Sequence, residues 1–169
     1  MTEYISRMVG DLVKQYATRD PYQLAEDLEV EVLFHPLGEY LKGYFFYQSR
    51  VKVIVINSDL PEEMQRVVCA HELGHSILHK DLAMANAVSD LTLFDKTARP
   101  EFEANLFASE LLIPDEDVIR ELNEDKSFFH VAGELMVPPE LLDFKFRLLK
   151  HKGYRLEAPL DSCGDFMKH

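Results

Sequence analysis

Apolar residues at helical spacing predict that the chain begins with two helices. In the first sixteen residues the apolar positions recur every three or four residues, at Ile5, Met8, Val9, Leu12, Val13 and Tyr16. A helix with one such apolar stripe buries it against a core. Pro21 suits the first turn of a second, shorter helix, and Asp20 is in position to cap it.

The pattern then changes to one typical of strands. Residues 29–34 alternate between polar and apolar side chains, and residues 43–47 and 51–57 are rich in aromatic and β-branched side chains. The segment Gln48-Ser49-Arg50 connects the last two as a hairpin. These segments predict a small antiparallel sheet that precedes the longest helix of the chain.

That helix is predicted over residues 61–79, because Pro61 fits a first helical position and apolar residues follow at helical spacing. Within it, residues 71–75 read His-Glu-Leu-Gly-His. Two histidines four residues apart project from one face of a helix, about one turn apart. Apolar residues occupy the same face, so both histidines are expected to be buried.

Two histidines at this spacing can bind one tetrahedral zinc ion, at about 2.0–2.1 Å each. Glu72 lies between them, where it can reach a water in the open coordination position and serve as general base. The alternative is a helix with two hydrogen-bonded core histidines and no metal. The combination of two histidines, the intervening glutamate and the nearby Gly74 favours the metal site.

A catalytic zinc site usually has three protein ligands and one open position. Pro100 and Pro114 bracket another predicted helix, in which two glutamates compete for the third ligand position. Glu101 shares a face with small residues, where another helix can approach closely. Glu103 lies about 160° away around the helix, on a polar face where a solvated carboxylate is expected. We therefore take Glu101 as the third ligand.

Two further residues are candidates for supporting the site. Asn105 lies one helical turn after Glu101 and can hydrogen-bond a metal ligand. His79 lies one turn after His75 and is a candidate for contact with substrate or with a carboxylate near the metal. The alternative for His79 is that it simply borders the end of its helix. His130, Tyr44 and Tyr47 are candidates for stabilising an oxyanion, but their spacing selects none of them.

The segments HELGHSILH and EFEANLFASELLIP resemble the ImmA/IrrE family of metallopeptidases, and the second segment is the more specific of the two. The resemblance implies an α+β fold: a zincin-like core with a small antiparallel sheet, an active-site helix and C-terminal helices that resemble a helix-turn-helix. It implies one Zn²⁺ on His71, His75 and Glu101, with Glu72 as general base. It also implies a helix-turn-helix repressor of a mobile element or stress regulon as the substrate, and a bacterial or phage-related source.

The C-terminal third is predicted to be helical, with helices that start near Asp115, Ser127 and Pro138. The last two either form a DNA-reading or partner-docking unit or pack on the catalytic core, and we favour packing. Accordingly, we expect residues 1–114 to form the catalytic core with the N-terminal helices. Residues 115–153 would form a helical subdomain on that core, and residues 154–169 a tail.

Charge and cysteine content narrow the function further. The formal net charge is −12, which disfavours broad nucleic-acid binding and suits a basic protein partner. No apolar run is long enough to span a membrane, and the N-terminus does not resemble a signal peptide, so a cytoplasmic location is expected. Two cysteines, Cys69 and Cys163, do not suggest a disulfide framework, which agrees with a reducing compartment. Cys163 is expected to be a free surface thiol, or alternatively a zinc ligand folded back from the tail.

These observations predict a zinc-dependent endopeptidase. The alternative is a zinc-bound regulatory module that binds a repressor or another partner without cleaving it. Glu72 argues against that alternative, since a structural site does not need a general base and usually has four ligands. Zinc is the preferred metal, although Mn²⁺, Fe²⁺ or Co²⁺ can occupy similar sites.

Overall fold

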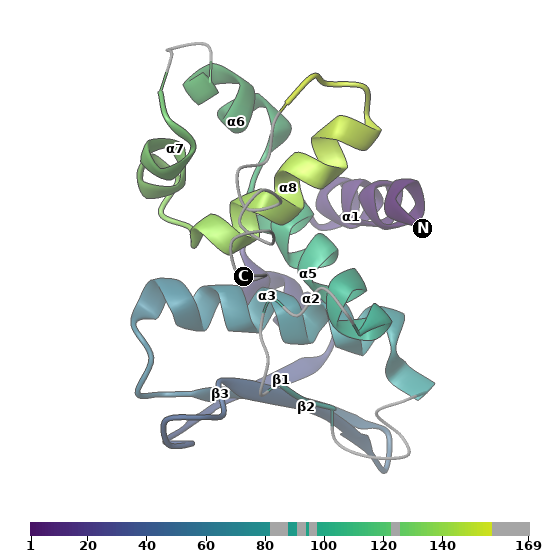
Figure 1. Cartoon of the computed structure of the whole chain (residues 1–169). Helices are drawn as coiled ribbons and strands as arrows, with labels where there is room; N and C mark the ends of the chain where they lie inside the picture. The colour runs from purple at the N-terminus through teal and green to yellow at the C-terminus, as the bar shows by residue number, and fades with distance from the viewer. Residues whose placement is uncertain (82–87, 91–93, 95–97, 123–125, 157–169) are drawn as a thin grey trace.

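The computed structural model describes residues 1–81, 88–90, 94, 98–122 and 126–156. Figure 1 shows a sheet on one side of the molecule, helix α3 lying across it, and the remaining large helices stacked on the opposite side of α3. The class is α+β, as predicted, with the arrangement of a zincin-like fold.

Both predicted N-terminal helices are present. Helix α1 spans Thr2–Tyr16 and buries Ile5 and Val9 against α5 and α8. Helix α2 spans Pro21–Asp27, and the Asp20 side chain accepts a hydrogen bond from the backbone N–H of Tyr22 at 3.0 Å. This contact confirms the predicted cap.

The sheet contains strands β1 (Val30–His35), β2 (Gly43–Gln48), β3 (Val51–Asn57) and β4 (Val88–Asp90) in the order β1-β3-β2-β4. The prediction of an antiparallel sheet is wrong for one pair of strands: β1 runs parallel to β3, while the other pairs are antiparallel. Residues 36–42 carry the chain past the position of β3, so that β3 enters between β1 and β2. Flanked by β1 and β2 and in contact with α3, β3 is buried from Val53 to Asn57.

The predicted hairpin between β2 and β3 is confirmed. Gln48 pairs with Val51, so the turn consists of Ser49 and Arg50 alone. Both turn residues have positive φ, 52° and 69°, which is the backbone geometry of a two-residue type I′ turn.

Helix α3 (Glu62–Leu78) lies between the sheet and helix α5 (Arg99–Leu112), and a glycine permits the close approach on each side. A Cβ atom on Gly43 of β2 would lie 2.5 Å from Cγ1 of Val68. On the other side, a Cβ on Gly74 would lie 3.2 Å from the Phe107 side chain and 3.3 Å from Cα of Ala104. Both approaches are tighter than an ordinary van der Waals contact.

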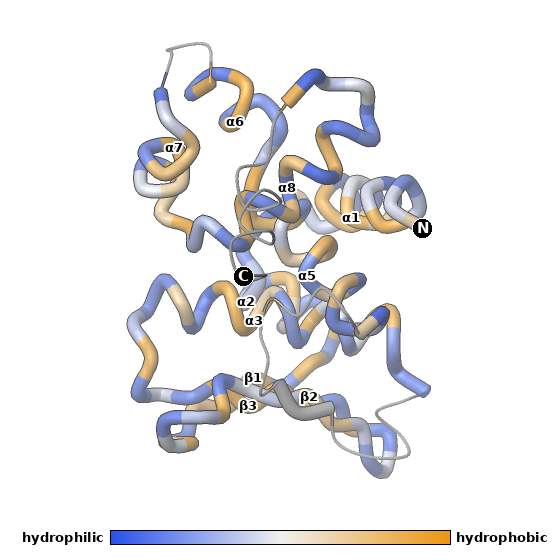
Figure 2. The backbone as a smooth tube through the Cα atoms, in the orientation of Figure 1, coloured by the Kyte–Doolittle hydropathy of each residue, from blue (hydrophilic) through white to orange (hydrophobic). Residues whose placement is uncertain are grey.

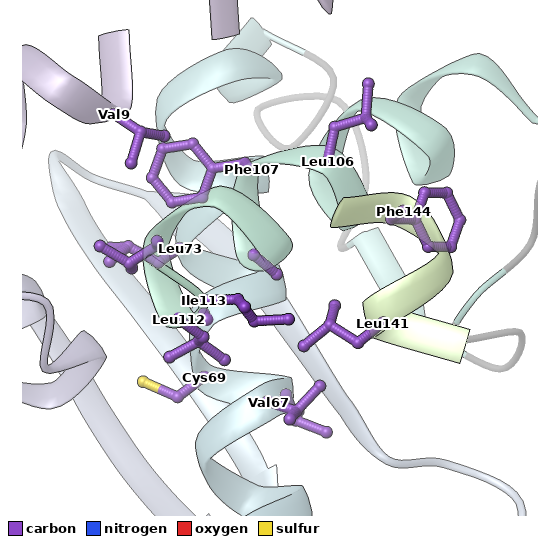
Figure 3. Close-up of a cluster of buried hydrophobic side chains, with 14 of the residues drawn as sticks. Val9, Val67, Cys69, Leu73, Leu106, Phe107, Leu112, Ile113, Leu141 and Phe144 are labelled. Atoms are coloured by element: carbon purple, nitrogen blue, oxygen red, sulfur yellow. The ribbon is translucent and has the colours of Figure 1, made fainter. Parts of the chain in front are cut away.

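Helices α6 (Asp115–Leu122), α7 (Phe128–Glu134) and α8 (Pro139–His151) complete the described chain. Figure 2 shows hydrophobic positions recurring between hydrophilic ones along these helices, as amphipathic helices require. Figure 3 shows Leu141 and Phe144 of α8 in the same buried cluster as Val67 and Leu73 of α3. Residues on both sides of position 114 therefore share one core, and the division there stays a prediction.

Helix α8 packs against α5 and α1, which agrees with the favoured packing role. Carboxylates hold two basic side chains of α8 and that of Lys152, which follows it: Lys145 by Glu110 and Asp115, Arg147 by Asp143, and Lys152 by Glu110 and Asp115. Those charges are therefore already neutralised by contacts within the fold. None of the helices in the described part of the chain is both long and apolar enough to cross a lipid bilayer.

Candidate metal centre

Helix α3 brings His71 and His75 together on one buried face. Both side chains are 0% exposed, and their ring centroids lie 4.8 Å apart. Their Nε2 atoms are 3.1 Å from each other. The one-turn spacing in the sequence thus produces the paired imidazoles that it predicts, at the level where α5 crosses α3.

Glu101 joins them from the first turn of α5. Its Oε2 lies 3.1 Å from Nε2 of His71, and its Oε1 lies 3.4 Å from Nε2 of His75. One potential ligand atom from each of the three residues lies within 4.8 Å of the others. For a tetrahedral ion with bonds of about 2.0–2.1 Å, neighbouring ligand atoms are about 3.3–3.4 Å apart. The separations of 3.1, 3.1 and 3.4 Å between the ligand atoms of His71, His75 and Glu101 are close to these values.

The outer nitrogen of each imidazole is occupied by another side chain. Nδ1 of His71 lies 3.0 Å from Oδ1 of Asn105, and Nδ1 of His75 lies 3.0 Å from Nδ1 of His79. On the far side of His79, Nε2 lies 2.9 Å from Oε2 of Glu103. The structure therefore places both candidate supporting residues, Asn105 and His79, in contact with the paired histidines.

These contacts determine which nitrogens carry protons in the neutral rings. An amide oxygen can only accept, so His71 has its N–H at Nδ1. A carboxylate can likewise only accept, so His79 donates from Nε2 to Glu103 and accepts at Nδ1. His75 then donates from Nδ1 to His79. As a result, the Nε2 lone pairs of His71 and His75 and an oxygen of Glu101 all point to one place.

Three converging acceptors are the chemistry of a cation site, because lone pairs at such distances repel unless a positive charge lies between them. Burial lowers the pKa of His75 to about 4, which keeps its ring neutral and able to bind a metal at neutral pH. Two imidazole nitrogens and one carboxylate oxygen are a common ligand set of catalytic zinc, so the residues present fit a divalent metal.

Glu103 is the residue that sequence reasoning misplaced. Only 14% of its side chain is exposed, and besides His79 it binds Nε of Arg99 at 2.8 Å. The reason is the point at which the helices cross: α5 approaches α3 at Ala104, opposite Gly74. The face toward α3 is centred on Ala104, so Glu101 and Glu103 flank it at about 60° and 100°. A helical wheel shows which residues share a face, but it does not show which face of α5 packs against α3.

The pKa of Glu103 supports an ionised carboxylate. Burial raises this pKa, but the hydrogen bonds from Arg99 and His79 lower it further, so the net shift is downward. An ionised Glu103 can only accept a hydrogen bond from His79, which is the condition that orders the protons along this chain of residues.

Glu72, the predicted general base, is also fully buried on α3. It faces the sheet, since a Cβ on Gly43 would lie 3.6 Å from Cγ of Glu72. Because Gly43 has no side chain, β2 can pass close to the Glu72 side chain at this point. The sequence offered no signal for that contact, which depends on how the sheet lies on α3.

The other candidates lie in different surroundings. Tyr44 stacks near the ring of Phe46, Lys80 lies over the ring of Tyr47 at 4.5 Å, and exposed His130 contacts Glu134 at 3.3 Å. These contacts give the tyrosines packing roles. Cys69 is buried in the core, and burial raises the pKa of its thiol. Cys163 and the proposed tail beyond residue 156 lie outside the described residues.

Comparison with known proteins identifies the class. The family described as the IrrE N-terminal-like domain matches residues 25–147, which is most of the chain. The chain is 38% identical over 141 residues to "Uncharacterized immunity region protein 2" of Bacillus phage phi105, covering 83% of this chain and 88% of the relative. It is 29% identical over 144 residues to "Metallopeptidase ImmA" of Bacillus subtilis (strain 168), covering 83% of each chain.

The chain therefore belongs to the ImmA/IrrE family of metallopeptidases, as its sequence motifs predicted.

Proposed function

We propose that this protein is a zinc-dependent endopeptidase. The observation that carries the proposal is the convergence of three ligand atoms, from His71, His75 and Glu101, with a buried carboxylate, Glu72, on the same helix as the two histidines. A structural zinc site usually has four protein ligands, whereas three ligands and a neighbouring carboxylate are typical of hydrolytic sites. Asn105 would hold His71 in the orientation that metal binding requires.

When bound there, Zn²⁺ would polarise the scissile carbonyl and lower the pKa of a water molecule to about 7. Glu72 would take a proton from that water as it attacks the carbonyl carbon. The same carboxyl group would then deliver the proton to the nitrogen of the departing amine. His71 and His75 would contribute neutral nitrogen ligands, and Glu101 would supply negative charge.

Strand β4 is the best candidate for the edge that receives the substrate. It lies at the end of the sheet, and Asp90 of β4 pairs with Gly43 of β2. Gly43 in turn lies against Glu72. An extended peptide added to the outer edge of β4 would lie at the end of the sheet nearer β2, the strand whose Gly43 faces Glu72, with backbone hydrogen bonds supplying sequence-independent binding.

The substrate we propose is a helix-turn-helix repressor. The family resemblance of the sequence supports this class, and the name of the phage relative, an immunity region protein, is compatible with it. The net charge of −12 would favour association with a basic partner and would repel free nucleic acid. We also propose that the protein acts in the cytoplasm.

Metal content is the first test. Wild-type protein and the Glu101→Ala and Glu72→Gln variants are exposed to Zn²⁺, desalted with a weak chelator and analysed by mass spectrometry. We expect about one zinc ion in wild type and Glu72→Gln, and none retained in Glu101→Ala. Wild-type protein that retains no metal would overturn the proposal.

Cleavage is the second test. A helix-turn-helix repressor is incubated with zinc-loaded wild type and with zinc-loaded Glu72→Gln, and fragments are identified by mass spectrometry. We expect the variant to cut about 10²–10⁴-fold more slowly, because it lacks the proton acceptor. Undiminished cutting by the variant would refute the role of Glu72. Binding without cutting by the wild type would instead support a regulatory module.

A further inference from the structure

We propose that His79 and Glu103 are positioning residues that orient His75 and increase its strength as a metal ligand. The inference rests on the proposed metal site and extends it by two residues that do not touch the metal. His79 is buried at the C-terminal end of α3, and Glu103 reaches it from α5. The pair thus ties the end of one helix to the side of the other.

The two metal-binding histidines are supported unequally. The chain behind His71 ends at Asn105, a neutral amide. The chain behind His75 passes through a second imidazole and ends at the carboxylate of Glu103, which Arg99 also contacts at 2.8 Å. A carboxylate that accepts a proton from an imidazole makes that ring more basic, and here the effect is passed through His79 to His75. His75 should therefore be the stronger nitrogen ligand.

The direction of the protons along this chain follows from the two contacts of Glu103. Its Oε1 accepts from Nε of Arg99 at 2.8 Å, and its Oε2 lies 2.9 Å from Nε2 of His79. A carboxylate held in this way accepts from His79, so Nδ1 of the neutral His79 ring accepts from His75. The Nε2 lone pair of His75 is thereby turned toward Glu101 and His71. If the chain were reversed, Nε2 of His75 would carry the proton and could not bind a metal.

The protons can be observed directly in metal-free protein. Nitrogen-15 NMR at neutral pH distinguishes the two neutral forms of each histidine ring. We expect His75 to carry its proton at Nδ1 and His79 at Nε2. In Glu103→Leu, which removes the acceptor, this preference of His79 should be lost. A wild-type His79 ring protonated at Nδ1 would overturn the proposal whether or not the protein binds zinc.

Metal affinity tests the consequence. The dissociation constant for Zn²⁺ is measured by competition with a chromogenic chelator for wild type, His79→Phe, Glu103→Leu and Glu103→Gln. Loss of such supporting contacts typically weakens metal binding about 10–100-fold, and we expect this for His79→Phe and Glu103→Leu. Glu103→Gln keeps an acceptor but removes the charge, so it should fall between wild type and Glu103→Leu.

Exposed residues provide matched controls. His130→Phe and Glu116→Gln make the same chemical changes away from the site and should leave zinc affinity unchanged. Thermal unfolding of each metal-free variant separates positioning from general support of the fold. Weakened zinc binding without recovery in Glu103→Gln, and in proportion to lost metal-free stability, would assign the pair a merely structural role.

The two proposals fail in different ways. If wild type binds no zinc, the proposed function fails, and the proton positions in metal-free protein still decide the arrangement of His75, His79 and Glu103. If wild type binds zinc and the His79 and Glu103 variants bind it equally tightly, only the positioning role fails.

Discussion

Helix α5 carries two polar clusters that differ in one respect, the balance of their charges. Near its start, Glu101, Glu103 and Asn105 face the histidines of α3. Near its end, Glu110 forms what we call the lysine cluster with Asp115, Lys145 and Lys152. Both clusters are largely enclosed by neighbouring helices. Only the second contains as many cations as anions.

In the lysine cluster each acceptor meets a donor. Lys152 contacts Glu110 at 2.6 Å and Asp115 at 2.7 Å, and Ser6 of α1 donates to Glu110 at 2.7 Å. The cluster is complete within the chain and joins α1, α5 and α8. At the metal centre, the partners of Glu101 are two rings whose lone pairs face it. A balanced cluster holds the fold together, whereas a cluster of converging acceptors requires a cation from outside.

The largest effect should follow from breaking the balanced cluster. Lys145→Met removes a fully buried cation and leaves Glu110 and Asp115 to share the charge of Lys152 alone. Removing one partner of a buried ion pair costs about 3–5 kcal/mol. Urea unfolding measures the loss, with Lys150→Met as the exposed control on the same helix. Adding Glu110→Gln to Lys145→Met should recover most of it. Equal losses in Lys145→Met and Lys150→Met would show that the cluster is not structural.

Metal should stabilise the other cluster by a smaller amount. Free Zn²⁺ at about 100 times its dissociation constant adds about 2.7 kcal/mol to the free energy of unfolding. For a chain of this size that raises the unfolding temperature by roughly 5–11 °C. Calorimetry with and without a chelator measures the shift. His71→Ala should show none, and a full shift in that variant would place the metal elsewhere.

The close contact that brings α5 to α3 can be tested with one methyl group. Gly74→Ala forces its Cβ against Phe107 and Ala104, and overpacking of this kind costs about 1–3 kcal/mol. It should also weaken zinc binding by displacing Glu101. Gly10→Ala is the matched control, because no atom lies within 4 Å of its added Cβ and alanine favours helices. Destabilisation by both substitutions would contradict the specific role of Gly74.

The smallest effect concerns pH. Burial raises the pKa of Glu110 and of Asp115, but Lys145 and Lys152 lower both by more, so these carboxyls titrate below their ordinary values of 4.5 and 3.8. The stability they contribute is complete above those values and is lost as the pH falls below them. Burial lowers the pKa of Lys152, but Asp115 and Glu110 raise it by more. Its contribution is complete below pH 10.5 and is lost at higher pH.

Urea unfolding of chelator-treated protein over a series of pH values measures this dependence. The Glu110→Gln/Lys145→Met variant should lose stability less steeply than wild type below about pH 4.5, since one depressed carboxyl has been removed. Identical acid profiles would show that the lysine cluster does not set the acid limit.

Local sequence patterns were sufficient wherever function depends on residues of one element. The four-residue spacing of His71 and His75 places them on one face of any helix, and the strand pattern around Ser49 and Arg50 predicts the hairpin. The residue types of these segments also carried the family resemblance. Covalent spacing and backbone periodicity decide such features, so the sequence by itself determines them.

Contacts between elements were decided only by the tertiary structure. The parallel pairing of β1 with β3, the pairing of β4 with β2, and the approach of Gly43 to Glu72 all depend on how separate elements pack. The same holds for Glu103, which a helical wheel assigned to solvent. Periodicity defines which side chains share a face, but the crossing point at Gly74 and Ala104 decides which face meets α3.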